Sequence, residues 1–218
     1  MSSYRNRASY SPSAPPFTYT PYGLGSSYGY YQNTPNYASF FPPGTDPQVI
    51  QSFQMVDRDH SGFVEDKELQ EALTSGYQRF SLRTIRLLIF LFKNPSEYFP
   101  RIGPKEFAAL WSCLGQWRSM FERFDRVRSG KIDATELRDA LYCLGYMMSP
   151  SVLEILISRY TDGSGRRPEL CFDSFVECEM VVKGLTEKFK EKDTCYTGCA
   201  KLTYDEFMSM ILPFIVSY

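Results

Sequence analysis

The chain has 218 residues, of which 43% are hydrophobic, and its formal net charge at pH 7 is -1. This is enough apolar material to bury a core in one or two domains. The near-neutral charge excludes a protein built for long-range attraction to nucleic acid or acidic membranes. The start of the chain has two arginines without an apolar run behind them, so we expect no secretory signal. The longest apolar run, residues 87–92, is far too short to span a bilayer, and we expect a cytoplasmic protein.

Residues 1–45 are predicted to form a disordered tail. They are rich in Tyr, Pro, Ser, Gly and Asn, and the first acidic residue is Asp46. A segment without aliphatic periodicity cannot bury enough apolar area to offset the entropy lost on ordering. Its tyrosines could contact partners or membranes, or be sites of phosphorylation. The alternative is that the segment is only a spacer. The folded domain is predicted over residues 46–218, because Asp46 offers an N-cap and Pro47 a first helical residue.

Residues 57–68, DRDHSGFVEDKE, place oxygen-bearing side chains at alternate positions of a tight loop. The pattern is that of an EF-hand calcium loop, because Ca²⁺ takes about six to eight oxygen ligands. Gly62 stands where the loop has to turn with positive φ. The predicted ligands are the side chains of Asp57, Asp59 and Ser61, the backbone carbonyl of Phe63, Glu65 through a water, and both carboxylate oxygens of Glu68.

The same apolar frame returns 68 residues later around the loop at 125–136, and after a further 68 residues at Asp193. Two degenerate loops lie between these three. The closing positions of the five loops are therefore Glu68, Glu106, Glu136, Ser174 and Glu206. Their gaps of 38, 30, 38 and 32 residues alternate, which indicates two pairs of hands and one left over.

Hands pair because the eighth position of each loop lies in a short strand that needs a partner strand. The predicted fold is therefore all-α, with five tandem EF-hand helix–loop–helix units and short β-strands in the loops. The first unit pairs with the second and the third with the fourth, and the fifth is left unpaired.

The other loops depart from the full ligand set in different ways. The third loop has Val127 in place of an oxygen ligand, so it is predicted as a weaker second site whose occupancy stays open. The second and fourth loops lack the oxygens and are predicted to be structural. In the fifth loop Asp193 and Thr197 could ligate, but Cys195 is a soft donor that a hard cation disfavours. The ligands of the third loop would be Asp125, Ser129, the backbone carbonyl of Lys131, Asp133 and Glu136.

Five tandem hands, two extra residues in the fifth loop, a long helix over residues 104–124 and a tail rich in Tyr, Pro and Gly occur together in this chain. In this combination the sequence resembles the penta-EF-hand family, which includes sorcin, grancalcin, peflin and the calpain small subunit, and it looks closest to the plant members. The resemblance implies a dimer through the fifth hand, either a homodimer or a heterodimer with another penta-EF-hand chain. It also implies targets that are proline-rich segments or membrane-associated proteins.

Catalysis is not expected. The one histidine, His60, lies inside the first loop, so no free histidine can act as the base of a Ser/His/Asp or Cys/His mechanism. The six cysteines are predicted to be mostly buried free thiols, with redox or metal binding by Cys195 and Cys199 as the alternative. An aromatic face on the long helix either packs in the core or lines a peptide groove. It consists of Trp111, Trp117, Met120 and Phe121.

The leading hypothesis is a calcium-responsive adaptor and not an enzyme. Calcium in the first loop would change the angle between its flanking helices and so alter an apolar surface for a target protein or a membrane. With calcium the protein would shift from the cytoplasm towards membranes or the nucleus. Two alternatives are a regulatory subunit of a calpain-like protease and a scaffold that holds Ca²⁺ or Mg²⁺ constitutively.

Overall fold

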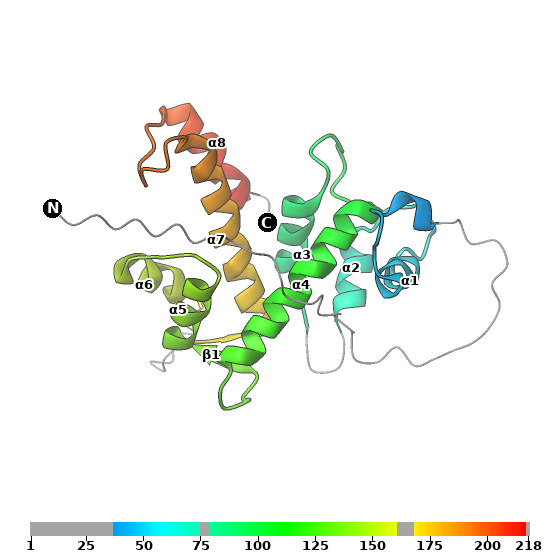
Figure 1. The fold of residues 1–218 in the computed structure, drawn as a ribbon, viewed down its shortest axis with the longest axis horizontal. Coiled ribbons are helices and arrows are strands. Elements are labelled where there is room, and N and C mark those ends of the chain that lie inside the picture. Colours follow the sequence, from blue (N-terminus) through cyan, green and yellow to red (C-terminus); the bar gives the residue numbers. More distant parts are fainter. Residues whose placement is uncertain (1–36, 75–78, 161–167, 217–218) are drawn as a thin grey trace.

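The structure is a computed structural model that describes residues 37–74, 79–160 and 168–216 (Figure 1). Helices dominate these residues, which confirms the predicted all-α class with short loop strands. Figure 1 places α1, α2 and α3 at one end and α5 and α6 at the other, with α4 and α7 running between. The elements are η1 (Tyr37–Phe40), α1 (Pro47–Val56), α2 (Asp66–Leu73), α3 (Leu82–Phe92), α4 (Pro104–Phe124), β1 (Lys131–Asp133), α5 (Ala134–Cys143), α6 (Pro150–Ser158), β2 (Glu169–Cys171), α7 (Phe172–Lys192) and α8 (Tyr204–Val216).

The loops pair as predicted. The N–H of Val64 donates to the Ile102 carbonyl at 2.8 Å, and the N–H of Ile102 donates back at 3.0 Å, which joins the first loop to the second. The third and fourth loops are joined by the antiparallel strands β1 and β2, with Ile132 opposite Leu170. All four of these side chains are fully buried. Within the described residues the fifth loop has no strand partner, in line with its predicted unpaired state.

Two long helices each serve two hands. The helix α4 leaves the second hand and enters the third, and α7 leaves the fourth and enters the fifth. The α4 helix begins as expected for Gly103 followed by Pro104 at the first helical position. The first and second hands form one lobe, and the third and fourth hands form the second lobe. The two lobes also meet directly, because the Glu177 carboxylate on α7 pairs with Arg83 of α3 at 3.0 Å and with Arg159, directly after α6, at 3.3 Å. Motion in one lobe therefore has physical routes to the other.

The aromatic face of α4 lies in the core. Trp111, Trp117 and Phe121 are each less than 5% exposed. The Trp111 ring stacks on Phe107 at 5.2 Å between centroids, and Trp117 meets Phe92 edge-on at 6.3 Å. Of the two predicted alternatives, core packing is the correct one.

The ordered part of the chain begins before residue 46. Tyr37 and Phe41 are buried, and their rings meet Phe53 of α1 edge-on at centroid distances of 5.4 and 5.5 Å. The predicted tail boundary at residue 45 is therefore too late, because two aromatic rings bury enough area to order a segment that lacks aliphatic periodicity. The predicted cap is confirmed, since Asp46 accepts the Gln48 N–H at 2.8 Å. Residues 1–36 lie outside the described residues.

The cysteines differ from the prediction of buried thiols. All six are free, but Cys143, Cys171, Cys195 and Cys199 are exposed, and Cys178 is the buried one. Helical periodicity was a poor guide to the burial of these cysteines, because four of them lie at helix ends or in a loop. None of the helices in the described residues is long and apolar enough to cross a membrane.

One acidic side chain in the core has no polar partner. Glu179 on α7 is 1% exposed, and neither of its carboxylate oxygens is hydrogen-bonded within the described residues. Burial raises the pKa of Glu179 to about 8, against a smaller opposite effect of Lys183. An unpaired carboxylate in such a place costs stability, so Glu179 is mostly protonated in the folded protein at neutral pH.

The raised pKa of Glu179 predicts a pH-dependent stability. The folded protein holds this proton more tightly than the unfolded chain, so the free energy of unfolding should fall as pH rises from the ordinary value of 4.5 to about 8. Glu179→Met should remove this slope and raise the free energy of unfolding at pH 8 by about 1–3 kcal/mol. Urea unfolding with a calcium chelator at pH 5 and pH 8 measures both effects. The control Glu187→Met replaces an exposed glutamate of the same helix and should change little; equal slopes for wild type and Glu179→Met would contradict the prediction.

Candidate metal centre

The first loop gathers three carboxylates between α1 and α2. One oxygen from each of Asp57, Asp59 and Glu68 can be chosen so that all lie within 4.8 Å of one another. In the described part of the chain, no other group of three or more acidic, histidine or cysteine side chains meets this condition. Three carboxylates this close repel one another unless a cation lies between them, so the donor set fits a hard divalent ion.

Backbone hydrogen bonds hold this loop in its turn. The Asp57 carboxylate accepts the N–H of Ser61 on Oδ1 at 2.9 Å and the N–H of Gly62 on Oδ2 at 3.0 Å. The turn needs the left-handed region at His60, with φ of 56°, and at Gly62, with φ of 81°. The Ser61 hydroxyl donates to the Phe63 carbonyl at 3.1 Å, which brings the fifth and seventh ligand positions together.

The closing glutamate faces back across the loop. Glu68 accepts the N–H of Arg58 on Oε1 at 3.0 Å and the N–H of Glu65 on Oε2 at 3.1 Å. Hydrogen bonds from Ser61 lower the pKa of Asp59, which keeps that carboxylate in the charged form that a metal requires. Of the six predicted ligands, the structure brings together Asp57, Asp59, Ser61, Phe63 and Glu68. Glu65 is the N-cap of α2, and its carboxylate is not among the clustered groups.

The sequence reasoning missed one residue that contacts this loop. The Tyr37 hydroxyl donates to Asp57 Oδ2 at 2.8 Å. Burial and this hydrogen bond raise the pKa of Tyr37 to about 12, so the hydroxyl stays protonated and remains a donor. The one sequence feature that could have indicated this contact is the spacing of Tyr37 and Phe41, two aromatic residues four positions apart before the cap at Asp46.

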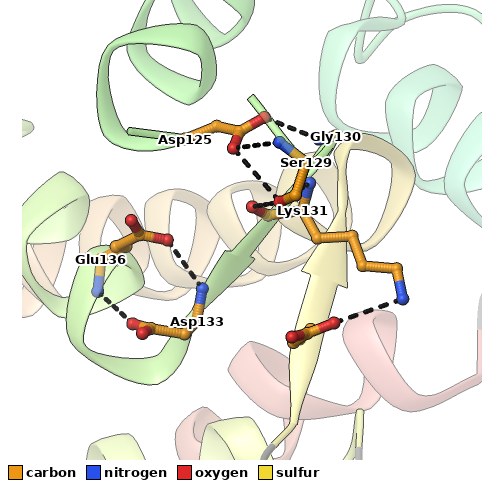
Figure 2. Close-up of polar contacts among 7 residues, drawn as sticks. Asp125, Ser129, Gly130, Lys131, Asp133 and Glu136 are labelled. Carbon is orange, nitrogen blue, oxygen red and sulfur yellow. Dashed lines mark hydrogen bonds and ion pairs between the residues drawn. The ribbon is translucent and has the colours of Figure 1, made fainter. Parts of the chain in front are cut away.

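The third loop has the same turn with a different set of carboxylates (Figure 2). Asp125 accepts the N–H of Ser129 at 2.8 Å and of Gly130 at 2.7 Å, and the Ser129 hydroxyl donates to the Lys131 carbonyl at 3.0 Å. Figure 2 shows the Glu136 carboxylate against the backbone nitrogen of Asp133, and the Asp133 carboxylate against the backbone nitrogen of Glu136, at the start of α5.

The acidic pair of the third loop caps a helix. Asp133 accepts the N–H of Thr135 and of Glu136, each at 2.8 Å, and Glu136 accepts the N–H of Asp133 at 3.0 Å. Val127 is 79% exposed and supplies no oxygen. The structure therefore brings together Asp125, Ser129 and the Lys131 carbonyl, while Asp133 and Glu136 form a capping box like that of Glu65 and Glu68 in the first loop.

These hands match known proteins. Residues 50–73 match the family described as EF hand, and residues 116–145 match that described as EF-hand domain. The chain is 49% identical to the probable calcium-binding protein CML48 of Arabidopsis thaliana, over 99% of each chain. It is 40% identical to peflin of Xenopus laevis over 88% of this chain, and it spans 66% of that protein. A solved structure of a homolog of programmed cell death 6 protein from Leishmania major Friedlin has a TM-score of 0.60 and 29% identity, over 75% of this chain and 92% of that chain.

The chain belongs to the penta-EF-hand family. With this membership it is a calcium-binding EF-hand protein, as the resemblance of its five loops implied. The relatives named above are calcium-binding proteins, peflin and a homolog of a cell death protein, and none of these names is that of an enzyme.

The fifth hand of this penta-EF-hand protein keeps the turn and uses its closing glutamate elsewhere. Asp193 accepts the N–H of Thr197 at 2.9 Å and of Gly198 at 2.7 Å, as in the first and third loops. Glu206, however, accepts the N–H of Thr203 at 2.9 Å and pairs with Lys192 at 2.9 Å. The Thr203 N–H and the Lys192 ammonium lower the pKa of Glu206 to about 2. Glu68 also accepts a backbone N–H from three residues before it, so the ion pair with Lys192 is what sets Glu206 apart and what a calcium ion would have to displace.

The second hand carries a positively charged side chain at the seventh position of its loop. The Arg101 guanidinium lies over the ring of Phe63 at 3.8 Å from its centroid, and it pairs with Glu97 at 3.2 Å. This cation–π contact joins the seventh positions of the first two loops and favours a structural role for the second. The fourth loop was predicted to be structural as well, and its residues 161–167 lie outside the described residues.

The exposed Val127 allows a direct test of the third loop. Val127→Asp supplies the missing carboxylate without disturbing the core, so it should tighten calcium binding by this loop about tenfold, because ligand charge and number set affinity. Calorimetric calcium titration, with the Gly130 amide resonance as a local reporter, measures the change. The control Tyr142→Asp adds the same charge at a residue of α5 that is 65% exposed. An unchanged Gly130 titration in Val127→Asp, or an equal gain in the control, would show that the loop is limited by something other than this ligand.

Proposed function

We propose that this penta-EF-hand protein is a calcium-responsive adaptor whose principal site is the loop at residues 57–68. The observation that carries the proposal is the grouping of the Asp57, Asp59 and Glu68 carboxylates within 4.8 Å. Ca²⁺ is the expected ion, because several charged oxygens and a backbone carbonyl suit its flexible coordination better than the strict octahedron of Mg²⁺. The proposed ligand set is Asp57, Asp59, Ser61, the Phe63 carbonyl, Glu68, and Glu65 through a water.

The position of Glu68 supports a mechanical response to the ion. Glu68 lies in the first turn of α2, so a cation that draws it towards Asp57 moves α2 relative to α1. The α2 helix packs on α3, and α3 packs on α7. The ion pair of Arg83 with Glu177 then joins α3 to the second lobe. Calcium in the first hand can thus alter surfaces on the second lobe.

An apolar cavity of the second lobe supports target binding there. Its volume is about 500 Å³, and it opens between the linker that follows α5, the helix α6 and the middle of α7. We expect it to take an apolar side chain of a target protein, with a proline-rich segment as the first candidate. The protein would then follow its target from the cytoplasm to membranes or the nucleus. The cavity is lined by Gly145, Tyr146, Met147, Met148, Val152, Leu156, Val181, Val182, Leu185 and Thr186.

The fifth hand supports a dimer. It has no strand partner among the described residues, and its helix α8 exposes large apolar side chains that water disfavours. A second copy of the chain, or another penta-EF-hand chain, would cover both features across a two-fold axis. The exposed side chains are Tyr204 at 75%, Phe207 at 46%, Leu212 at 40% and Ile215 at 64%.

Glu68→Gln tests the site assignment. The substitution removes the closing charge, so the tightest calcium dissociation constant should rise at least tenfold, because ligand charge sets affinity. The calcium-dependent increase in binding of a hydrophobic dye should be lost with it. Glu206→Gln is the matched control, because that glutamate is already held by Lys192. The assignment is wrong if Glu68→Gln leaves the tightest site unchanged, and a wild type without any dye response would favour a constitutive scaffold.

Phe207→Asp tests the dimer. A charge in the centre of an apolar interface should weaken self-association at least tenfold, about 1.4 kcal/mol or more. Sedimentation velocity at micromolar concentration measures it. The control Ile155→Asp changes an α6 residue that is 73% exposed and should leave the dimer intact. A wild type that sediments as a monomer would favour a heterodimer, and a dimeric Phe207→Asp would exclude this face.

A further inference from the structure

The three loops that share the turn differ in one contact at their first aspartate. In each of them Oδ1 accepts the amide of the fifth position and Oδ2 accepts the amide of the sixth. Asp57 Oδ2 also accepts the Tyr37 hydroxyl at 2.8 Å, and among the described residues Asp125 and Asp193 have no such donor from outside their loops. Asp57 is accordingly 0% exposed, whereas Asp125 and Asp193 are each 7% exposed.

The hydroxyl is held in place by packing outside the loop. The Tyr37 ring is 3% exposed and meets Phe53 edge-on, and Phe41 also meets the Phe53 ring edge-on. After Phe41, the N–H and hydroxyl of Thr45 both donate to the Pro42 carbonyl, at 3.1 and 2.7 Å, which turns the chain into α1. The donor to Asp57 is therefore part of a folded segment, residues 37–45, that packs on the first hand.

We propose that Tyr37 is a positioning residue of the first calcium loop, and that calcium in this loop is coupled to docking of residues 37–41 on α1. The inference rests on the proposed function, because it needs residues 57–68 to hold the ion. A donor on Oδ2 fixes the rotation of the Asp57 carboxylate, so that Oδ1 faces the other ligands before the ion arrives. Removing such an outer contact from a metal ligand typically lowers affinity about 10–100-fold.

The coupling works in both directions. If docking of residues 37–41 tightens calcium binding, then calcium must tighten docking by the same factor. The docked segment is the point at which residues 1–36, with their many tyrosines and prolines, join the folded domain. Calcium in the first loop would thus strengthen the anchor of the tail as well as change the helices of the hand.

Tyr37→Phe isolates the hydroxyl, because it keeps the ring that packs on Phe53. Calcium titration of the full chain, followed at the Gly62 and Gly130 amide resonances, reports the first and third loops separately. The midpoint at Gly62 should move to about tenfold higher calcium, and any transition at Gly130 should stay in place. The control Tyr98→Phe, at a residue that is 90% exposed, should titrate as wild type. An unchanged midpoint at Gly62, or equal shifts at both glycines, would overturn the inference.

Glu68→Gln separates this inference from the site assignment on which it rests. If Glu68→Gln leaves the Gly62 titration unchanged, the assignment of residues 57–68 fails, and with it the role given to Tyr37. If Glu68→Gln abolishes that titration while Tyr37→Phe has no effect, the assignment stands and the role of Tyr37 is excluded. If Glu68→Gln abolishes the Gly62 titration and Tyr37→Phe moves its midpoint to higher calcium, both the site assignment and the role of Tyr37 are supported.

A second measurement leaves Tyr37 unchanged and follows the docking of residues 37–41 directly. Chymotrypsin cleaves after aromatic residues that are not followed by proline, and cleavage after Tyr37 or Phe40 requires residues 37–41 to leave α1. In the wild-type protein, calcium should slow these cleavages about fivefold or more relative to chelator, and Glu68→Gln should remove the difference. Mass spectrometry of the early products identifies the bonds. Equal cleavage rates with and without calcium in wild type would exclude the coupling.

Discussion

The fold depends on a turn that recurs in three of the calcium-type loops. In each turn the first aspartate of the loop accepts hydrogen bonds from two backbone amides. They occur at Asp57, Asp125 and Asp193 with donor–acceptor distances of 2.7–3.0 Å. Bonds to a charged acceptor are stronger than neutral ones, so the turn survives where ligands have been lost. In the first and third loops the turn also directs the next apolar residue, Val64 or Ile132, to its partner in the neighbouring hand.

The ability to bind a metal ion is separate from this turn, because it depends on the other ligands of each loop. Only in the first loop, among the described residues, do three carboxylates come together, and their repulsion in the absence of a cation favours binding of one. In the third loop Val127 leaves the third ligand position without an oxygen. In the fifth, Lys192 neutralises Glu206. One family scaffold thus holds a site suited to calcium beside hands that mainly support the pairing, the lobes and the proposed dimer.

Sequence reasoning reached the parts of this structure that depend on spacing. The pairing of the hands, the cap at Asp46 and the long helix over residues 104–124 follow from gaps, turn residues and apolar periodicity, which are local properties. It failed where burial depends on packing between distant segments. Cys143 and Cys171 follow an apolar pattern yet lie exposed at element ends, and Glu179 has an ionisable side chain yet is buried on α7. Neither outcome can be obtained from periodicity along one helix.

By itself, the sequence determined the family and the five hands, and it predicted the ligand set of the first loop, because ligand identity and spacing lie within twelve consecutive residues. Only the tertiary structure decided that Glu206 is held by Lys192 from the preceding helix. It also decided that Tyr37, separated from Asp57 by 20 positions, completes the hydrogen bonding of the first ligand. The physical reason is that an aromatic segment without periodicity finds its place only when α1 and α4 have formed the surface on which it packs.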